Sequence, residues 1–162
     1  MPTIKAYHGS DYKIEKFIHF QKEFTNDQYG PGIYFTNKES IARGYGKYLY
    51  EVKINTKGFI TSSSDYDESK LLKIITDNLT TDLLLDWGDT TKIARSNIIN
   101  QTLDEESFYD TLMNIWANVF RLNNKKYLDA CVKAGINGLI KGMTIGTKYY
   151  IVYNTENIKW TT

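Results

Sequence analysis

The sequence has little of what several classes of protein depend on. It contains one cysteine, Cys131, among 162 residues, which excludes an internal disulfide framework and a cysteine-rich zinc site. Its 20 Lys and Arg residues nearly balance its 19 Asp and Glu residues. It therefore lacks the basic excess that is typical of proteins that bind nucleic acid in bulk. Its 2 histidines lie far from the cysteine and from each other, so the spacing predicts no metal site.

Long hydrophobic runs are missing as well. No apolar stretch approaches the ~20 residues that a membrane-spanning helix needs. The opening "MPTIKAYHGS" has no apolar region of the kind found in a signal peptide. We also find no internal repeat and no long linker. We therefore expect a cytoplasmic protein without a membrane partner, folded as one domain over residues 1–162.

Strand patterns dominate the first third of the chain. Period-two alternation and β-rich composition predict strands over 3–9, 32–36 and 48–55. Between the last two, "NKESIARGYG" (37–46) predicts a short helix that ends near its two glycines. Asn37 stands where an N-cap is expected.

After a serine-rich stretch, the pattern becomes helical. Apolar residues recur at three- and four-residue spacing in 67–79 and 104–135. Strand patterns return in 136–142 and 148–160. The sequence therefore predicts an α+β fold in which a strand-rich body carries a helical insertion at about 66–134.

The first motif that could carry chemistry is "YHGS". Gly9 lets the backbone approach a ligand closely, and Ser10 adds a hydroxyl beside the imidazole of His8. A strand that ends in a turn, with His8 hydrogen-bonded in the core, would use the same residues. Taken alone, a His-Gly pair favours this structural interpretation.

The second motif is "GPGIYFTNKESIARGYG", residues 30–46. Gly30 and Gly32 permit a tight backbone path around a proline. Tyr34 and Tyr45 are separated by a strand end and a short helix, so both rings could converge on one pocket. A tyrosine face stacks on a flat ring while its hydroxyl binds at the edge. Core packing is the alternative for either ring.

The third motif is "KYYIVYN", residues 148–154. Alternation would place Tyr149 and Ile151 on one face of a strand, with Tyr150 and Val152 on the other. A buried central strand would explain this pattern without any function.

The order of these three motifs resembles the ADP-ribosyltransferase family, in the branch of diphtheria toxin and the poly(ADP-ribose) polymerases. The matching segments are 6–10, 30–54 and 136–154. The chain is also similar to small ADP-ribosyltransferase domains of phage proteins. That likeness rests on "YHGS", "GPGIYFTNKESIARGY", "LYEVKI" and "LLLDWGDT".

The resemblance implies a split β-sheet core that binds NAD as the ADP-ribose donor, without a metal. His8 would hydrogen-bond a ribose hydroxyl, the Gly9 backbone would hold the nicotinamide carboxamide, and Tyr45 would stack on the ring. It implies a catalytic triad formed by His8, Tyr34 and Tyr149. The implied cofactor-binding residues are His8, Gly9, Ser10, Gly32, Tyr34, Phe35, Ala42 and Tyr45.

Two positions depart from the family pattern. Ala42 stands where the family commonly has a serine that binds the carboxamide. Tyr149 stands where the polymerases have a glutamate that supports chain elongation. The resemblance therefore implies transfer of single ADP-ribose units rather than polymers. Glu156 and Asp129 are the other carboxylates considered for that role, and a solvated surface position would equally explain both. Arg43 could meet the NAD pyrophosphate or simply lie on an exposed helix face.

The expected function is mono-ADP-ribosylation of a protein acceptor, with release of nicotinamide. By likeness, this would be a phage effector in the host cytoplasm that modifies host or antiviral defence proteins. The alternative is a catalytically silent module that binds NAD or ADP-ribose and acts by binding. Transfer to nucleic acid and plain NAD hydrolysis are third options. The helical insertion is the expected surface for partner recognition.

Overall fold

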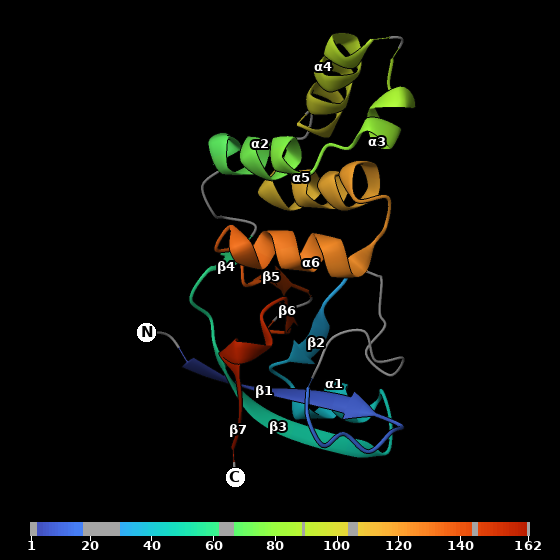
Figure 1. Ribbon diagram of the computed structural model, residues 1–162. Helices are drawn as coiled ribbons and strands as arrows, with labels where there is room; N and C mark the ends of the chain where they lie inside the picture. Colours follow the sequence, from blue (N-terminus) through green and yellow to red (C-terminus); the bar gives the residue numbers. More distant parts are fainter. Residues whose placement is uncertain are drawn as a thin grey trace. The chain divides into compact units, whose positions relative to one another are not determined.

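The computed structural model describes residues 3–17, 30–61, 67–88, 90–103, 107–143 and 146–161. The chain divides into two compact units, which are described separately. One unit comprises Met1–Thr61 with Gly135–Thr162, and the other comprises Ser62–Ala134. The first holds a mixed sheet and one short α-helix, and the second is helical (Figure 1).

The sheet unit contains a seven-stranded sheet with the strand order β4-β5-β6-β2-β1-β3-β7. Among the described strands, only β4 and β5 pair in parallel, while the other neighbours are antiparallel. Sheet and helices together confirm the predicted α+β class. The strands are β1 (Thr3–Ser10), β2 (Ile33–Thr36), β3 (Tyr48–Asn55), β4 (Phe59–Thr61), β5 (Gly138–Gly142), β6 (Lys148–Val152) and β7 (Ile158–Trp160).

The sheet is split between β1 and β2. β1 pairs with β3 along its whole length, from Thr3 to Ser10. β2 pairs with β6 through all of its residues. Between β1 and β2, by contrast, the described residues pair at one position, Tyr7 with Thr36. Two half-sheets therefore meet at a short seam, as the predicted split β-sheet requires.

The two faces of the sheet unit are covered differently. Alternation along β1 turns Ala6, His8 and Ser10 to a buried face. The opposite face of β1 carries the short helix α1 (Glu39–Arg43), whose buried residue is Ala42. The core cluster of the buried face consists of Ala6, Ile14, Phe17, Ile33, Phe35, Val52, Ile54, Tyr150 and Val152.

The described part of the helical unit contains capped α-helices of five to twelve residues and one π-helix of five residues. Five of its N-termini accept a backbone N–H on a Ser, Thr, Asp or Asn side chain. None of the described helices is long and apolar enough to cross a membrane. The helices are α2 (Glu68–Asp77), α3 (Thr81–Leu85), α4 (Thr91–Thr102), α5 (Phe108–Asn114), the π-helix η2 (Ile115–Val119) and α6 (Asn124–Lys133).

The predicted N-cap at Asn37 is wrong. The helix begins one residue later than that cap would require, and Lys38 is the N-cap, without a side-chain hydrogen bond. The Asn37 side chain instead accepts from the Lys148 N–H at 2.9 Å and donates to the Gly146 carbonyl oxygen at 2.8 Å. Bonds to a neighbouring hairpin have displaced the local cap.

Two long predicted segments are also interrupted. The helical pattern over 104–135 yields α5, η2 and α6, and two residues with left-handed backbone, Arg121 and Leu122, lie between η2 and α6. The strand expected over 148–160 stops at Val152. A 3-10 helix, η3 (Thr155–Asn157), then leads into β7, which lies beside β3 at one edge of the sheet. Helix α4 was not predicted as a separate helix, although the capping residue Thr90 stands at its start.

Candidate functional site

His8 lies on β1 where the two half-sheets meet. Its side chain is almost fully enclosed, with 8% of the residue exposed. The imidazole meets Phe17 edge-on, with ring centroids 5.5 Å apart, and lies 5.5 Å from the ring of Phe35. Aromatic rings therefore hold the imidazole in one orientation.

A hydrogen bond from His8 spans the seam. Its Nδ1 lies 2.6 Å from the backbone carbonyl oxygen of Tyr34 on β2. Because a carbonyl can only accept, Nδ1 carries the proton in this bond. Burial lowers the pKa of His8 below its ordinary value of 6.5, and the bond to Tyr34 opposes this shift only in part. The imidazole is therefore neutral at pH 7, and its Nε2 carries the lone pair.

Tyrosines gather on the opposite face of the sheet. Thr36 pairs with Tyr149, and Tyr34 pairs with Ile151, so Tyr34 and Tyr149 project from the same side of adjacent strands. The hydroxyl oxygens of Tyr45 and Tyr149 lie 2.7 Å apart, although 104 residues separate them. The Tyr34 hydroxyl donates to the Gly30 carbonyl oxygen at 2.7 Å.

Gly9 allows α1 to sit directly on β1. A Cβ at this position would lie 1.8 Å from the Ala42 carbonyl oxygen and 3.3 Å from the Cβ of Tyr45. Ala42 itself is buried. Only glycine permits this approach, and the approach fixes the start of the turn that carries Tyr45. Tyr45 remains 53% exposed, so its ring is accessible to a ligand.

The remaining predicted binding residues have clear structural surroundings. Gly32 has a φ of +137°, and a Cβ there would lie 2.6 Å from the Ile151 Cγ2. Ser10 is buried on the same face as His8, and its hydroxyl accepts from the Tyr12 N–H at 3.0 Å. Phe35 belongs to the core cluster. The predicted set thus divides between the two faces of the sheet.

The charged candidates lie on exposed surfaces. Arg43 pairs with Glu39 at 3.6 Å on α1. Glu156 is exposed in η3. Asp129 is exposed on α6, in the helical unit, and pairs with Lys125 at 3.4 Å. Among the described residues, no group of three or more His, Cys, Asp or Glu side chains could hold a metal ion. The second histidine, His19, and Asp89 of the segment "LLLDWGDT" lie outside the described residues.

Sequence reasoning missed the residues that position these side chains. Phe17 fixes the His8 ring from a segment with no recognisable motif. Tyr7 lines the tyrosine face because it pairs with Thr36, which in turn pairs with Tyr149. The alternation of "TIKAYHGS" indicates on which face of the strand Tyr7 lies. The residues beside Tyr7 on the adjacent strands could not be predicted, because they depend on the order of the strands in the sheet.

Comparison with known proteins gives one family match. The model of the family described as "ADP-Ribosyltransferase in polyvalent proteins" matches residues 2–162. A solved structure titled "Crystal structure of an anti-CRISPR protein" is 14% identical, covers 97% of this chain and 93% of its own, and has a TM-score of 0.46. That likeness carries no functional argument, and no curated protein matches the sequence. Since the family match spans essentially the whole chain, this protein belongs to the ADP-ribosyltransferases of polyvalent proteins.

Proposed function

We propose that this chain is an NAD-dependent mono-ADP-ribosyltransferase that modifies a protein acceptor and releases nicotinamide. One observation carries the proposal. The hydroxyls of Tyr45 and Tyr149 meet at 2.7 Å, beside the seam that His8 bridges. Tyr45 and Tyr149, from two separated motifs, thereby meet on the tyrosine face, while His8 lies on the other face of the same sheet.

NAD would bind at the seam between the two half-sheets. Nicotinamide would lie on the tyrosine face, with Tyr45 against its ring and the backbone edge at Gly9 holding its carboxamide. Among the described residues, β1 pairs with β2 no further than Tyr7. His8 faces the other side of the sheet and is enclosed by Phe17 and Phe35, so the nicotinamide ribose would reach it only when these rings move aside. With Nδ1–H committed to Tyr34, the Nε2 of His8 would accept a hydrogen bond from a ribose hydroxyl.

The reaction would break the bond between nicotinamide and the ribose C1′. The bonding electron pair leaves with nicotinamide, and C1′ acquires oxocarbenium character. A nucleophilic side chain of the acceptor then bonds to C1′ and loses its proton. The protein would contribute positioning and a fixed polar environment, rather than a covalent intermediate.

Tyr149 favours single transfer over polymer synthesis. A tyrosine hydroxyl cannot supply the negative charge of the glutamate that the polymerases have at this position. Its contact with Tyr45 gives it instead a part in ordering the ring that would stack on nicotinamide. We therefore expect one ADP-ribose per modified site.

Incubation with labelled NAD and host lysate tests the proposal. We expect His8→Ala and Tyr45→Ala to lower protein labelling at least ~100-fold, because misplacement of a reacting group costs about that much. Tyr48→Ala is the matched control, since Tyr48 is another exposed tyrosine of the same unit. Labelling that survives both site variants would contradict the assignment.

A silent binding module is the second candidate, because Tyr149 removes the glutamate. Calorimetric binding of NAD without any release of nicotinamide, even in lysate, would support it. Free ADP-ribose without a labelled product would instead indicate hydrolysis.

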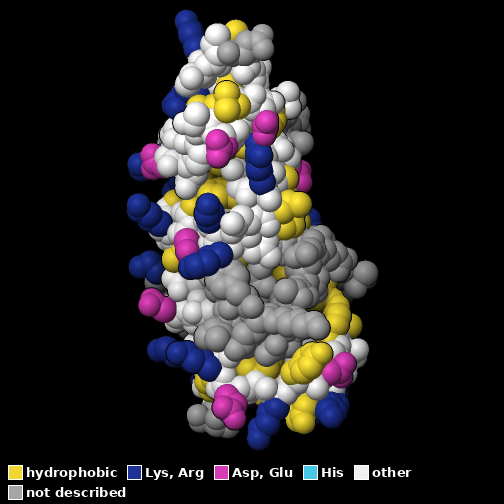
Figure 2. All heavy atoms as spheres, turned by 45° about the vertical axis from the view of Figure 1, so that its right-hand side comes forward, with side chains coloured by type: hydrophobic (Ala, Val, Ile, Leu, Met, Phe, Trp, Pro, Cys, Tyr) yellow, Lys and Arg dark blue, Asp and Glu magenta, His cyan; other side chains and the backbone are white. Residues whose placement is uncertain are grey.

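The class of acceptor is tested by digestion of the labelled product. Loss of the label on treatment with a protease indicates a protein acceptor, and loss on treatment with a nuclease indicates nucleic acid. Lys and Arg are interspersed with Asp and Glu on the face in Figure 2, which favours a protein acceptor. The phage setting, with host or defence proteins as acceptors, belongs to the same proposal.

A further inference from the structure

A groove lies within the helical unit, between α2 and α6. Its volume is about 1090 Å³, and all its lining residues belong to Ser62–Ala134. Each wall helix has ten residues, which corresponds to a length of about 15 Å. The groove can therefore hold a short peptide segment.

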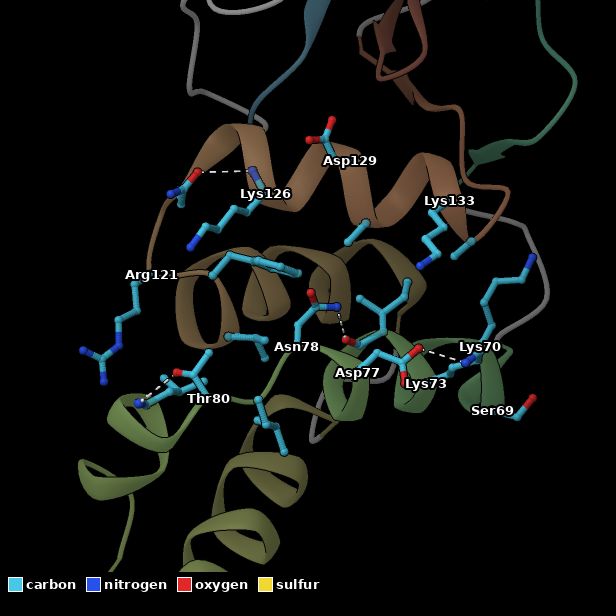
Figure 3. A pocket seen from close by; sticks show the side chains of 18 of the residues that line it. Ser69, Lys70, Lys73, Asp77, Asn78, Thr80, Arg121, Lys126, Asp129 and Lys133 are labelled. Atoms are coloured by element: carbon cyan, nitrogen blue, oxygen red, sulfur yellow. Dashed lines mark hydrogen bonds and ion pairs between the residues drawn. The ribbon is translucent and has the colours of Figure 1, made fainter.

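Lysines line both walls of the groove. Lys126 and Lys133 are separated by seven positions on α6, so they share a helix face with Ala130 between them. Lys70 stands on α2, across the groove (Figure 3). The apolar side chains beneath are already largely buried, including Ile74. Charge, more than apolar contact, would therefore select what binds.

The aspartates around the groove are mostly engaged. Asp77 pairs with Lys73 at 2.8 Å, and Asp129 pairs with Lys125 at 3.4 Å. Asp67 caps α2 by accepting from the Lys70 N–H at 3.1 Å. In the part of the chain that the structure describes, no carboxylate lies within ion-pair distance of Lys70, Lys126 or Lys133. Lys70 nevertheless lies near enough to Asp67 to attract its carboxylate, so Lys126 and Lys133 are the lysines that an acidic ligand would meet.

The backbone beside the groove is unusual. The π-helix η2 ends at Phe120, and Arg121 and Leu122 follow with φ values of 50° and 64°. Such left-handed residues cost free energy, and π-helices occur often at functional sites. Arg121 lines the groove and forms an ion pair with Asp86 at the end of α3.

We propose that the groove between α2 and α6 binds an acidic segment of the acceptor protein. This inference rests on the proposed function for the identity of the partner. Lys126 and Lys133 would pair with Asp or Glu side chains of the segment, and small side chains would face the apolar floor. Nucleic acid fits less well, because Phe120 is too buried to stack on a base.

A peptide array tests the groove directly. The probes are peptides of about 12 residues with a constant alanine-rich frame, in which the remaining positions are all Glu, all Gln or all Lys. We expect the 162-residue chain to bind the Glu series about tenfold more tightly than the Lys series. The double variant Lys126→Glu/Lys133→Glu should reverse that preference. Lys92→Glu, on α4 and outside the groove, is the matched control.

The array has clear failing outcomes. Absence of a charge preference, or a preference that the double variant leaves unchanged, overturns the proposal. A labelled single-stranded oligonucleotide that binds the wild type, and that the double variant releases, would also overturn it by assigning the groove to nucleic acid. Circular dichroism of the variants confirms that the helices are retained.

Transfer assays link the groove to the acceptor. With labelled NAD and host lysate, the double variant should label protein about tenfold less than the wild type. The rate of nicotinamide release with water as the acceptor should stay unchanged. Equal labelling by both proteins would refute acceptor docking at the groove. Absence of nicotinamide release from the wild type would refute the proposed activity instead, and the array would still decide whether the groove binds acidic segments.

Discussion

The two faces of β1 carry different kinds of candidate residue. One face encloses His8 among aromatic rings, so its position depends on burial and on one bond to the β2 backbone. The other face brings Tyr45 and Tyr149 together at an accessible surface, through hydroxyl contact. The difference indicates that the enclosed face fixes geometry, whereas the accessible face is free to meet a ligand.

Gly9→Ala should have the largest effect, because it disrupts the accessible face at its base. The new Cβ would lie 1.8 Å from the Ala42 carbonyl oxygen. Since that atom belongs to the backbone, α1 or β1 must shift. We expect the free energy of unfolding to fall by about 2–3 kcal/mol, measured by urea denaturation. Nicotinamide release should fall with it, because Tyr45 moves with α1.

Gly142→Ala is the matched control for that substitution. Gly142 is the last residue of β5 and Gly9 is the penultimate residue of β1, but a Cβ at Gly142 would meet nothing within 4 Å. Its free energy of unfolding should change by no more than about 0.5 kcal/mol. Equal effects of the two substitutions would show that the approach of α1 to Gly9 is not what constrains the accessible face.

Lowering the pH should weaken the enclosed face. Burial lowers the pKa of His8 below its ordinary value of 6.5. As the pH falls through 6.5, His8 becomes protonated in the unfolded chain but stays neutral in the folded chain. The free energy of unfolding therefore decreases. The contribution of neutral His8 to stability is complete above pH 6.5 and decreases progressively as the pH falls below that value.

The melting temperatures of wild type and His8→Gln, compared from about pH 7.5 to about pH 5.5, isolate this contribution. The wild-type advantage should shrink as the pH falls, since glutamine does not titrate. A difference that stays constant across this range would mean that His8 is not held neutral by burial. Burial on the enclosed face would then have no effect on the protonation of His8, and the two faces would not differ in this respect.

The sequence predicts the accessible face better than the enclosed one. Period-two alternation correctly separates Tyr149 from Tyr150, and the split sheet follows from the resemblance. The aromatic enclosure of His8 could not be predicted, because Phe17 acquires its role only through tertiary packing. Asn37 failed as a cap for the same reason, since the hairpin that binds it lies more than 100 residues away.

The smallest expected effect concerns the contact between Tyr45 and Tyr149. Both residues are at least partly exposed, so their hydroxyl bond should contribute about 0.5–1 kcal/mol to stability. A double-mutant cycle with Tyr45→Phe and Tyr149→Phe measures this coupling without removing either ring. If the bond orders Tyr45 for stacking, each single variant should raise the KM for NAD, and the double variant should raise it no further. Additive increases would show that the two hydroxyls act separately, so that the accessible face would be a set of independent contacts instead of one ordered surface.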